Sequence, residues 1–121
     1  MDEHDWGSAR MVELVREHLA LPFFDARDLV QEVALVDGDV RVVLRRLRDD
    51  DRPHAVRYSL QRLPAGPWTG EVCETPEQWA VEVSGDLTEV IATREIEQGE
   101  RRVEADGVLL VRWWSGDNWS H

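Results

Sequence analysis

The chain has 121 residues, of which 25 are Asp or Glu and 14 are Lys or Arg, so its formal net charge is −11. All 14 basic residues are arginine, which excludes Schiff-base chemistry and P-loop phosphate transfer because both need a lysine. The acidic excess argues against general binding to nucleic-acid phosphates. The length predicts a single domain over 1–121 that can bury a core without a disulfide or a metal, and the hydrophobic fraction of 42% argues against disorder.

Cysteine usage and the N-terminal segment predict the compartment. The single cysteine, Cys73, cannot form a disulfide within the chain. The segment 1–5 is acidic where a signal peptide is basic, and no apolar run approaches the roughly 20 residues that span a bilayer. The sequence therefore predicts a cytoplasmic protein with no membrane segment.

The first predicted element is an amphipathic helix over Ser8–Ala20. Asp5 or Ser8 is its expected N-cap, and Pro22 is expected to stop it. Its apolar stripe has the spacing of one helical face: Met11, Leu14, Val15, His18 and Leu19.

The pair Asp37–Gly38 lies between two β-rich runs, which is typical of a two-residue type I′ hairpin. This turn predicts the register of both strands: Val36 opposite Asp39, Leu35 opposite Val40, Val33 opposite Val42 and Gln31 opposite Leu44. A third strand is expected over Ala55–Leu63, with Val56, Tyr58 and Leu60 facing inward and Arg57 facing outward. These three strands are expected to form an antiparallel meander.

A second helix is predicted to start at Thr75. Thr75 is expected to cap it, Pro76 suits the first helical position, and Gln78 completes a capping box. A strand through Trp79 and Val83 is the alternative, but the cap and the spacing favour a helix with these inward positions: Trp79, Val83, Leu87, Val90 and Ile91.

The pair Asp106–Gly107 predicts a second two-residue hairpin, with Ala105 opposite Val108 and Val103 opposite Leu110. The last strand is apolar on both sides, and its back face is expected to hold Leu109, Val111 and Trp113. The predicted fold is therefore α+β, an antiparallel sheet of about five strands in the order α-β-β-β-α-β-β, packed with two helices.

Charge is distributed unevenly along the chain. The stretch 64–100 carries nine acids and one arginine, whereas seven arginines lie between Arg41 and Arg62. The second helix is thus expected to carry a negative face, and the second and third strands a positive edge. One interpretation is a solvated helix and a strand edge guarded against pairing, and the other is a docking surface for a basic partner.

Several side chains of the sequence are of types that can carry out chemistry. A thiol near a helix start, such as Cys73, can be activated, but its acidic neighbours favour a passive role. His18 is expected to be a core or border histidine. His54 near Asp49–Asp51 could hold a cation, and Asp117 with His121 forms another acid–histidine pair, but solvated acids and a polar tail are the favoured interpretations. No metal site, no cofactor and no catalytic residue is predicted, and an enzyme is disfavoured.

Six tryptophans are the other unusual feature. Trp113 and Trp114 are adjacent on a strand and therefore point to opposite faces, so burying both requires cover on each face. A partner or a homodimer could supply that cover, whereas a small apolar ligand in a pocket walled by Trp6, Trp68 and Trp79 is the alternative.

The leading prediction is a non-enzymatic protein-binding module, such as an adaptor, a chaperone or an immunity-type protein, whose acidic helix meets a basic partner. Its last strand is expected to be covered by that partner or by a second copy of the chain in a homodimer. The alternative is a small-molecule-binding protein or a small-molecule enzyme. The predicted binding residues are Glu77, Glu82, Asp86, Glu89, Leu109, Val111 and Trp113.

Overall fold

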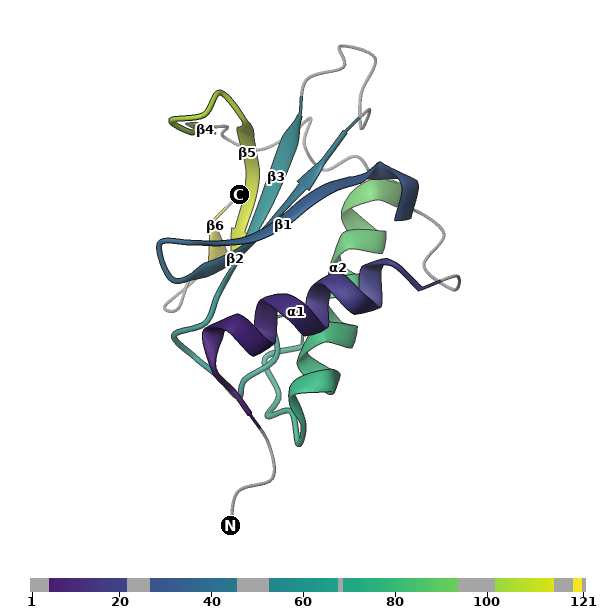
Figure 1. The fold of residues 1–121 in the computed structure, drawn as a ribbon, viewed down its shortest axis with the longest axis vertical. Helices are drawn as coiled ribbons and strands as arrows, with labels where there is room; N and C mark the ends of the chain where they lie inside the picture. Colours follow the sequence, from purple (N-terminus) through teal and green to yellow (C-terminus); the bar gives the residue numbers. More distant parts are fainter. Residues whose placement is uncertain are drawn as a thin grey trace.

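The computed structural model describes residues 5–21, 27–45, 53–67, 69–93, 102–114 and 119–120, and at 27, 93, 102, 109, 111–114 and 119–120 it describes the backbone alone. Two helices cover one face of a β-sheet (Figure 1), so the predicted α+β class is confirmed. The elements in chain order are α1 (Ser8–Leu19), the short 3₁₀ helix η1 (Arg27–Leu29), β1 (Val30–Val36), β2 (Asp39–Leu44), β3 (His54–Ser59), α2 (Pro76–Thr93), β4 (Arg102–Val103), β5 (Leu109–Trp114) and β6 (Trp119–Ser120).

Helix α1 forms where its periodicity predicts, but its cap differs. The N-cap residue is Gly7, and no side chain caps the helix. Asp5 does not act as the cap, because its Oδ1 accepts the N–H of Gly7 at 2.8 Å. The predicted cap by Asp5 or Ser8 is therefore wrong.

The first hairpin follows the register that its turn predicts. Asp37 and Gly38 have φ of 52° and 83°, as a type I′ turn requires, and Val36 pairs with Asp39 and Val33 with Val42. The register holds as far as Glu32, which pairs with Val43, and then shifts, so that Val30 instead of Gln31 pairs with Leu44. The prediction failed at Gln31 because a bulge inserts one residue, as is common on an edge strand such as β1.

Strand β3 completes the predicted antiparallel meander, with Val56 paired to Val42 and Tyr58 to Val40. Val56 and Tyr58 are fully buried, as expected. The strand ends at Ser59 instead of Leu63, since the chain turns there and the N–H of Gln61 donates to Ser59 Oγ.

The remainder of the sheet differs from the prediction of about five antiparallel strands. The sheet has six strands in the order β1-β2-β3-β5-β4, with β6 beside β5, and β3 and β5 run parallel. Parallel neighbours need a long crossover connection, and the stretch between β3 and β5 that contains α2 supplies it. Strong turn signals indicate hairpins, but nothing local in a sequence specifies a parallel pair.

The second hairpin has a three-residue loop instead of the predicted two-residue turn. The N–H of Gly107 donates to the carbonyl of Glu104 at 2.9 Å, and the N–H of Glu104 donates to the carbonyl of Val108 at 2.8 Å. Gly107 has φ of 85°, the left-handed conformation that closes a loop of this type. Val103 therefore pairs with Leu109 instead of Leu110, and a shift of one residue reverses the face of every side chain relative to its partner.

The main core lies between the helices and the covered face of the sheet. Trp79 of α2 is 1% exposed and meets Tyr58 of β3 edge to face, with ring centroids 6.4 Å apart. Aromatic pairs of this kind add about 0.5–1.5 kcal/mol to the free energy of burial. A second, smaller cluster lies apart from this core: Val43, Ala55, Val108 and Leu110.

Candidate functional site

The start of α2 is built as the sequence predicts. Thr75 Oγ1 accepts the N–H of Gln78 at 3.2 Å, which satisfies one of the free donors at a helix start. The side chain of Gln78 bonds back one residue earlier than a capping box requires, because its Oε1 accepts the N–H of Glu74 at 2.6 Å. The loop before α2 is thereby tied to the first turn of the helix.

The predicted acidic residues of α2 do not all lie on one surface. Glu77 and Glu89 are exposed, whereas Asp86 is fully buried. Asp86 Oδ2 accepts the hydroxyl proton of Tyr58 at 2.7 Å, so this carboxylate faces the sheet and the core. Asp86 therefore does not belong to an exposed docking surface.

The carboxylate of Glu82 binds the loop that precedes α2. Its Oε1 accepts the N–H of Thr69 at 3.0 Å, its Oε2 accepts the Thr69 hydroxyl at 3.0 Å, and the Cys73 thiol lies 3.6 Å from Oε2. Gly66 is so close to this carboxylate that a Cβ there would overlap its atoms. Glu82 thus holds the loop 66–73 against the helix.

Cys73 is a passive thiol in this setting. It is 4% exposed, and burial, together with the negative charge and hydrogen bond of Glu82, raises its pKa to about 11. Thiolates are the nucleophilic form of cysteine, so a pKa this high leaves Cys73 protonated near neutral pH. The interpretation that favoured a passive residue agrees with this geometry.

An open groove lies between this loop and α2. Its volume is about 320 Å³. It is lined by Glu71, Val72, Cys73, Gln78, Val81 and Glu82. Val72 is 73% exposed and Val81 50% exposed, so two valines face solvent beside carboxylates. We call this feature the α2 groove.

The arginines of β2 and β3 are not a positive edge. Arg41 and Arg57 pair across the two strands, and each side chain is only 8% exposed. Like charges directly opposite on a sheet are destabilising, and acids from the β4–β5 hairpin compensate them. Arg57 faces away from the helix-covered core, as predicted, but its side chain is buried under acids instead of forming a positive edge.

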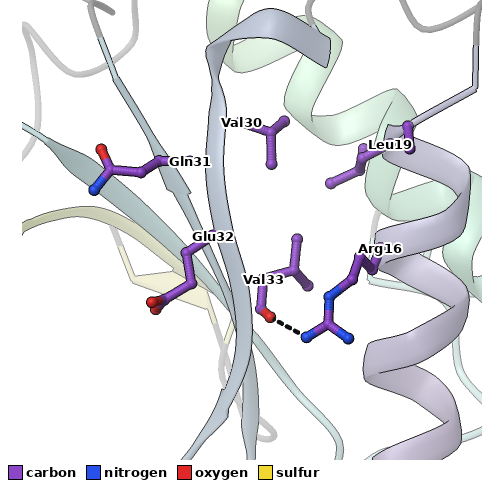
Figure 2. A pocket seen from close by; sticks show the side chains of 7 residues that line it. Arg16, Leu19, Val30, Gln31, Glu32 and Val33 are labelled. Carbon is purple, nitrogen blue, oxygen red and sulfur yellow. Dashed lines mark hydrogen bonds between the residues drawn. The ribbon is translucent and has the colours of Figure 1, made fainter.

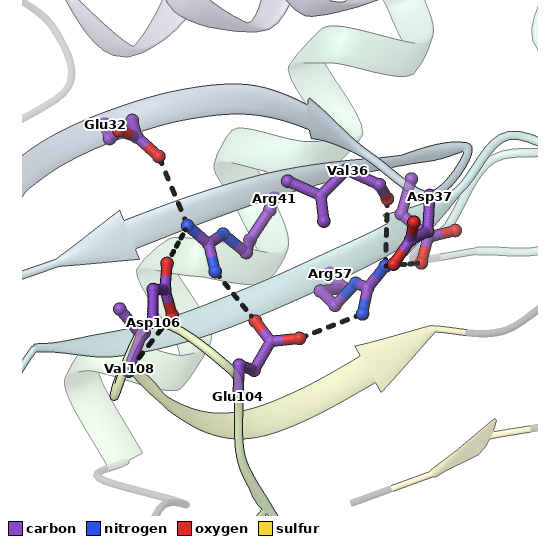
Figure 3. A network of polar contacts seen from close by, with 9 residues as sticks. Glu32, Val36, Asp37, Arg41, Arg57, Glu104, Asp106 and Val108 are labelled. Atoms are coloured by element: carbon purple, nitrogen blue, oxygen red, sulfur yellow. Dashed lines mark hydrogen bonds and ion pairs between the residues drawn. The ribbon is translucent and has the colours of Figure 1, made fainter.

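Figure 3 shows this arrangement, which we call the sheet network. Glu104 bridges both arginines, with Oε1 3.0 Å from Arg41 Nη1 and Oε2 2.9 Å from Arg57 Nη1. The other ion pairs are Arg41 with Asp106 at 2.7 Å and with Glu32 at 3.3 Å, and Arg57 with Asp39 at 2.9 Å and with Asp37 at 3.8 Å. The network ties the hairpin to the face of the sheet opposite the helices.

Titration in the sheet network follows from these contacts. The hydrogen bond from Arg41, aided by the N–H of Val108, holds the pKa of Asp106 below its ordinary value. The hydrogen bond to Asp106 in turn raises the pKa of Arg41, with smaller contributions from Glu104 and Glu32, against the opposing effect of burial. Both shifts favour the charged forms.

Sequence reasoning missed the sheet network, because the hairpin register was displaced by one residue. One feature of the sequence could have indicated this network. Two arginines on the same face of neighbouring inner strands need acids above them, and Glu104 and Asp106 are the acids next to the second turn.

The predicted back face on the last strand lies outside the described side chains. For Leu109, Val111 and Trp113 only the backbone is described. Leu109 pairs with His54 and Trp113 with Arg57, and the register shifts between them, which interrupts the regular alternation that the prediction assumed. The expectation that Trp113 and Trp114 are both covered therefore stays a prediction.

The tryptophans proposed as pocket walls have separate positions. Trp79 fills the core, Trp6 is partly buried against that core, and Trp68 lies outside the described residues. A second groove, between α1 and β1 (Figure 2), has a volume of about 380 Å³ and is lined by Arg16, Leu19, Ala20 and residues 30–33. Neither this groove nor the α2 groove is lined by a described tryptophan.

The described part of the chain lacks two further kinds of feature. It contains no group of three or more His, Cys, Asp or Glu residues arranged to hold a metal ion. The cation site suggested for His54 with Asp49–Asp51, and the pair Asp117 and His121, include residues outside the described ranges. Among the described helices, none combines the length and the apolar character that crossing a bilayer requires.

No family model, no curated protein and no solved structure matches the chain. The functional proposal therefore depends on the residues of the chain itself.

Proposed function

We propose that the protein is a non-enzymatic protein-binding module, such as an adaptor, a chaperone or an immunity-type protein, which meets a basic partner through the start of α2. Three exposed carboxylates support this proposal: Glu71, Glu74 and Glu77, which we call the acidic side. The stretch 64–93 contains no basic residue, and within the described residues none of the three forms an ion pair. The negative electrostatic field of these carboxylates attracts and orients a partner of opposite charge.

The proposal depends on the contrast between the exposed acids of the acidic side and the buried arginines of the sheet. Arg41 and Arg57 of the described sheet are buried and matched by acids, so they do not offset the acidic side. Glu89 extends the surface toward the far end of α2. Glu82 acts through the loop that it holds, and Asp86 is not part of the surface because it is buried.

A second contact is proposed for β5. Leu109, Val111 and Trp113 would meet the same partner or a second copy of the chain, since an apolar strand needs cover on both faces. We propose that this occurs in the cytoplasm, because a chain with one cysteine gains nothing from an oxidising compartment.

The charge proposal is tested by selection from a displayed library of random peptides at low salt. We expect the enriched peptides to be basic, and their affinity to fall as salt is added because exposed charge pairs are screened. The double variant Glu74→Gln/Glu77→Gln should weaken binding by about three- to tenfold, which corresponds to two exposed ion pairs.

The matched control is Glu13→Gln/Glu17→Gln, which removes the same charge from the exposed side of α1. We expect it to retain most of the affinity. Enrichment of acidic or neutral peptides, or equal losses in the two double variants, would overturn the proposal.

A further inference from the structure

The α2 groove combines exposed apolar side chains with carboxylates. Five large hydrophobic side chains of the described residues are exposed, and two of them, Val72 and Val81, line this one groove. Glu71 lines the same groove, and Glu74 and Glu77 follow Glu71 in the sequence. An apolar surface edged by carboxylates is complementary to an apolar side chain next to a positive one.

The wall of the groove is held in place by the protein itself. The N–H of Gly66 donates to the carbonyl of Glu71 at 2.8 Å, and the N–H of Cys73 donates to the carbonyl of Pro64 at 2.9 Å. Ala65 and Val72 form a β-bridge, and Glu82 binds Thr69 from the helix. A wall fixed in this way does not need to be ordered on binding, which lowers the entropic cost of association.

We propose that the α2 groove takes an extended segment of a partner protein that inserts one aliphatic side chain between Val72 and Val81 and places an arginine or lysine beside Glu71. This inference rests on the proposed function and specifies the partner. The aliphatic side chain supplies affinity by leaving water, and the positive residue supplies orientation.

The occupant is a protein segment because of the shape and charge of the site. The groove is open, and Glu71 of the acidic side and Glu82 line it, so a ligand in it stays in contact with solvent and with carboxylates. A peptide suits such a place, since its backbone remains hydrated while one side chain is buried. A nucleic acid is repelled by the same carboxylates.

Three synthetic peptides of equal length test the inference, with affinities measured by calorimetry at low salt. The first has a leucine flanked by arginines, the second replaces the leucine by serine, and the third keeps the leucine and replaces the arginines by glutamates. We expect the first to bind, the second to bind about tenfold more weakly, as the loss of one buried aliphatic side chain implies, and the third not to bind.

Backbone amide signals in NMR spectra locate the peptide. Val72 and Val81 line the groove, so their N–H signals should shift when the leucine peptide is added. The serine peptide at the same concentration should shift them less.

A pair of valine variants provides the matched control. Val81→Ser should remove the advantage of leucine over serine, whereas Val103→Ser, at a valine of β4 that is 61% exposed and does not line the groove, should preserve it. Equal binding of the leucine and serine peptides, or equal effects of the two variants, would overturn the groove inference and leave the charge proposal standing. Failure of both basic peptides to bind would overturn both.

Discussion

The sheet network and the acidic side use the same residue types in opposite ways. In the sheet network, Glu104 lies between two arginines and is 11% exposed. On the acidic side, Glu71, Glu74 and Glu77 are exposed with no arginine in the stretch around them. Carboxylates that are buried must be paired, whereas carboxylates in water can stay unmatched until a partner arrives. The comparison separates acids that maintain the fold from acids that are free to bind.

The largest expected effect comes from breaking the sheet network. Arg57→Ala leaves Glu104 with one arginine and removes the 2.9 Å partner of Asp39, whose side chain is 8% exposed. Removing one member of a buried ion pair typically costs about 3–5 kcal/mol, so we expect a loss of this size in the free energy of unfolding measured with urea.

Arg10→Ala is the control, because Arg10 forms an ion pair with Glu13 in which both side chains are largely exposed. Exposed pairs contribute less than about 1 kcal/mol. If the two variants lost the same stability, the sheet network would not be maintaining the fold.

A smaller effect is expected from acid titration of Asp106. The pKa of Asp106 in the folded protein lies below its ordinary value of 3.8 because Arg41 binds the carboxylate. Its ion pair therefore adds stability above pH 3.8, and this contribution is lost as the pH falls through the lowered pKa.

The Asp106→Asn variant lacks this titration. We expect the wild-type protein to lose more stability than the variant between about pH 5 and about pH 2, measured as the urea midpoint. Parallel curves for the two proteins over this interval would contradict the lowered pKa.

The smallest effect is expected on the acidic side. The double variant Glu71→Gln/Glu74→Gln removes two exposed carboxylates that form no ion pair with a described residue, so the free energy of unfolding should change by no more than about 0.5 kcal/mol. Thermal unfolding with circular dichroism suffices to check this. A large loss would show that these acids maintain the fold, and the difference between the two regions would disappear.

Elements with strong local signals were predicted well. The turn Asp37–Gly38 specified the register of β1 and β2 because positive φ at both positions leaves one arrangement of the flanking strands. The cap at Thr75 and the helical spacing from Trp79 to Val90 specified α2, and all the predicted inward positions from 79 to 90 are buried.

Elements that depend on contacts between distant parts of the chain were not predicted well. The bulge at Gln31, the three-residue loop at 105–107 and the parallel pair of β3 with β5 each depend on what lies across the sheet. The same holds for the candidate site. Glu77 and Glu89 lie on the surface as expected, but Asp86 faces the core, since its place in the helix turns it toward Tyr58.

The sequence alone determined the helices, the three-stranded meander and the concentration of acid in the stretch that contains α2, because periodicity, caps and turns act over a few residues. Only the tertiary structure decided which charges are matched. It brought Glu104 and Asp106 onto Arg41 and Arg57 across 47 to 65 residues of chain, and it left Glu71, Glu74 and Glu77 without an ion pair among the residues that the structure describes. Charge pairing is a property of distance in space, and a linear pattern carries no information about that distance until the strands are placed.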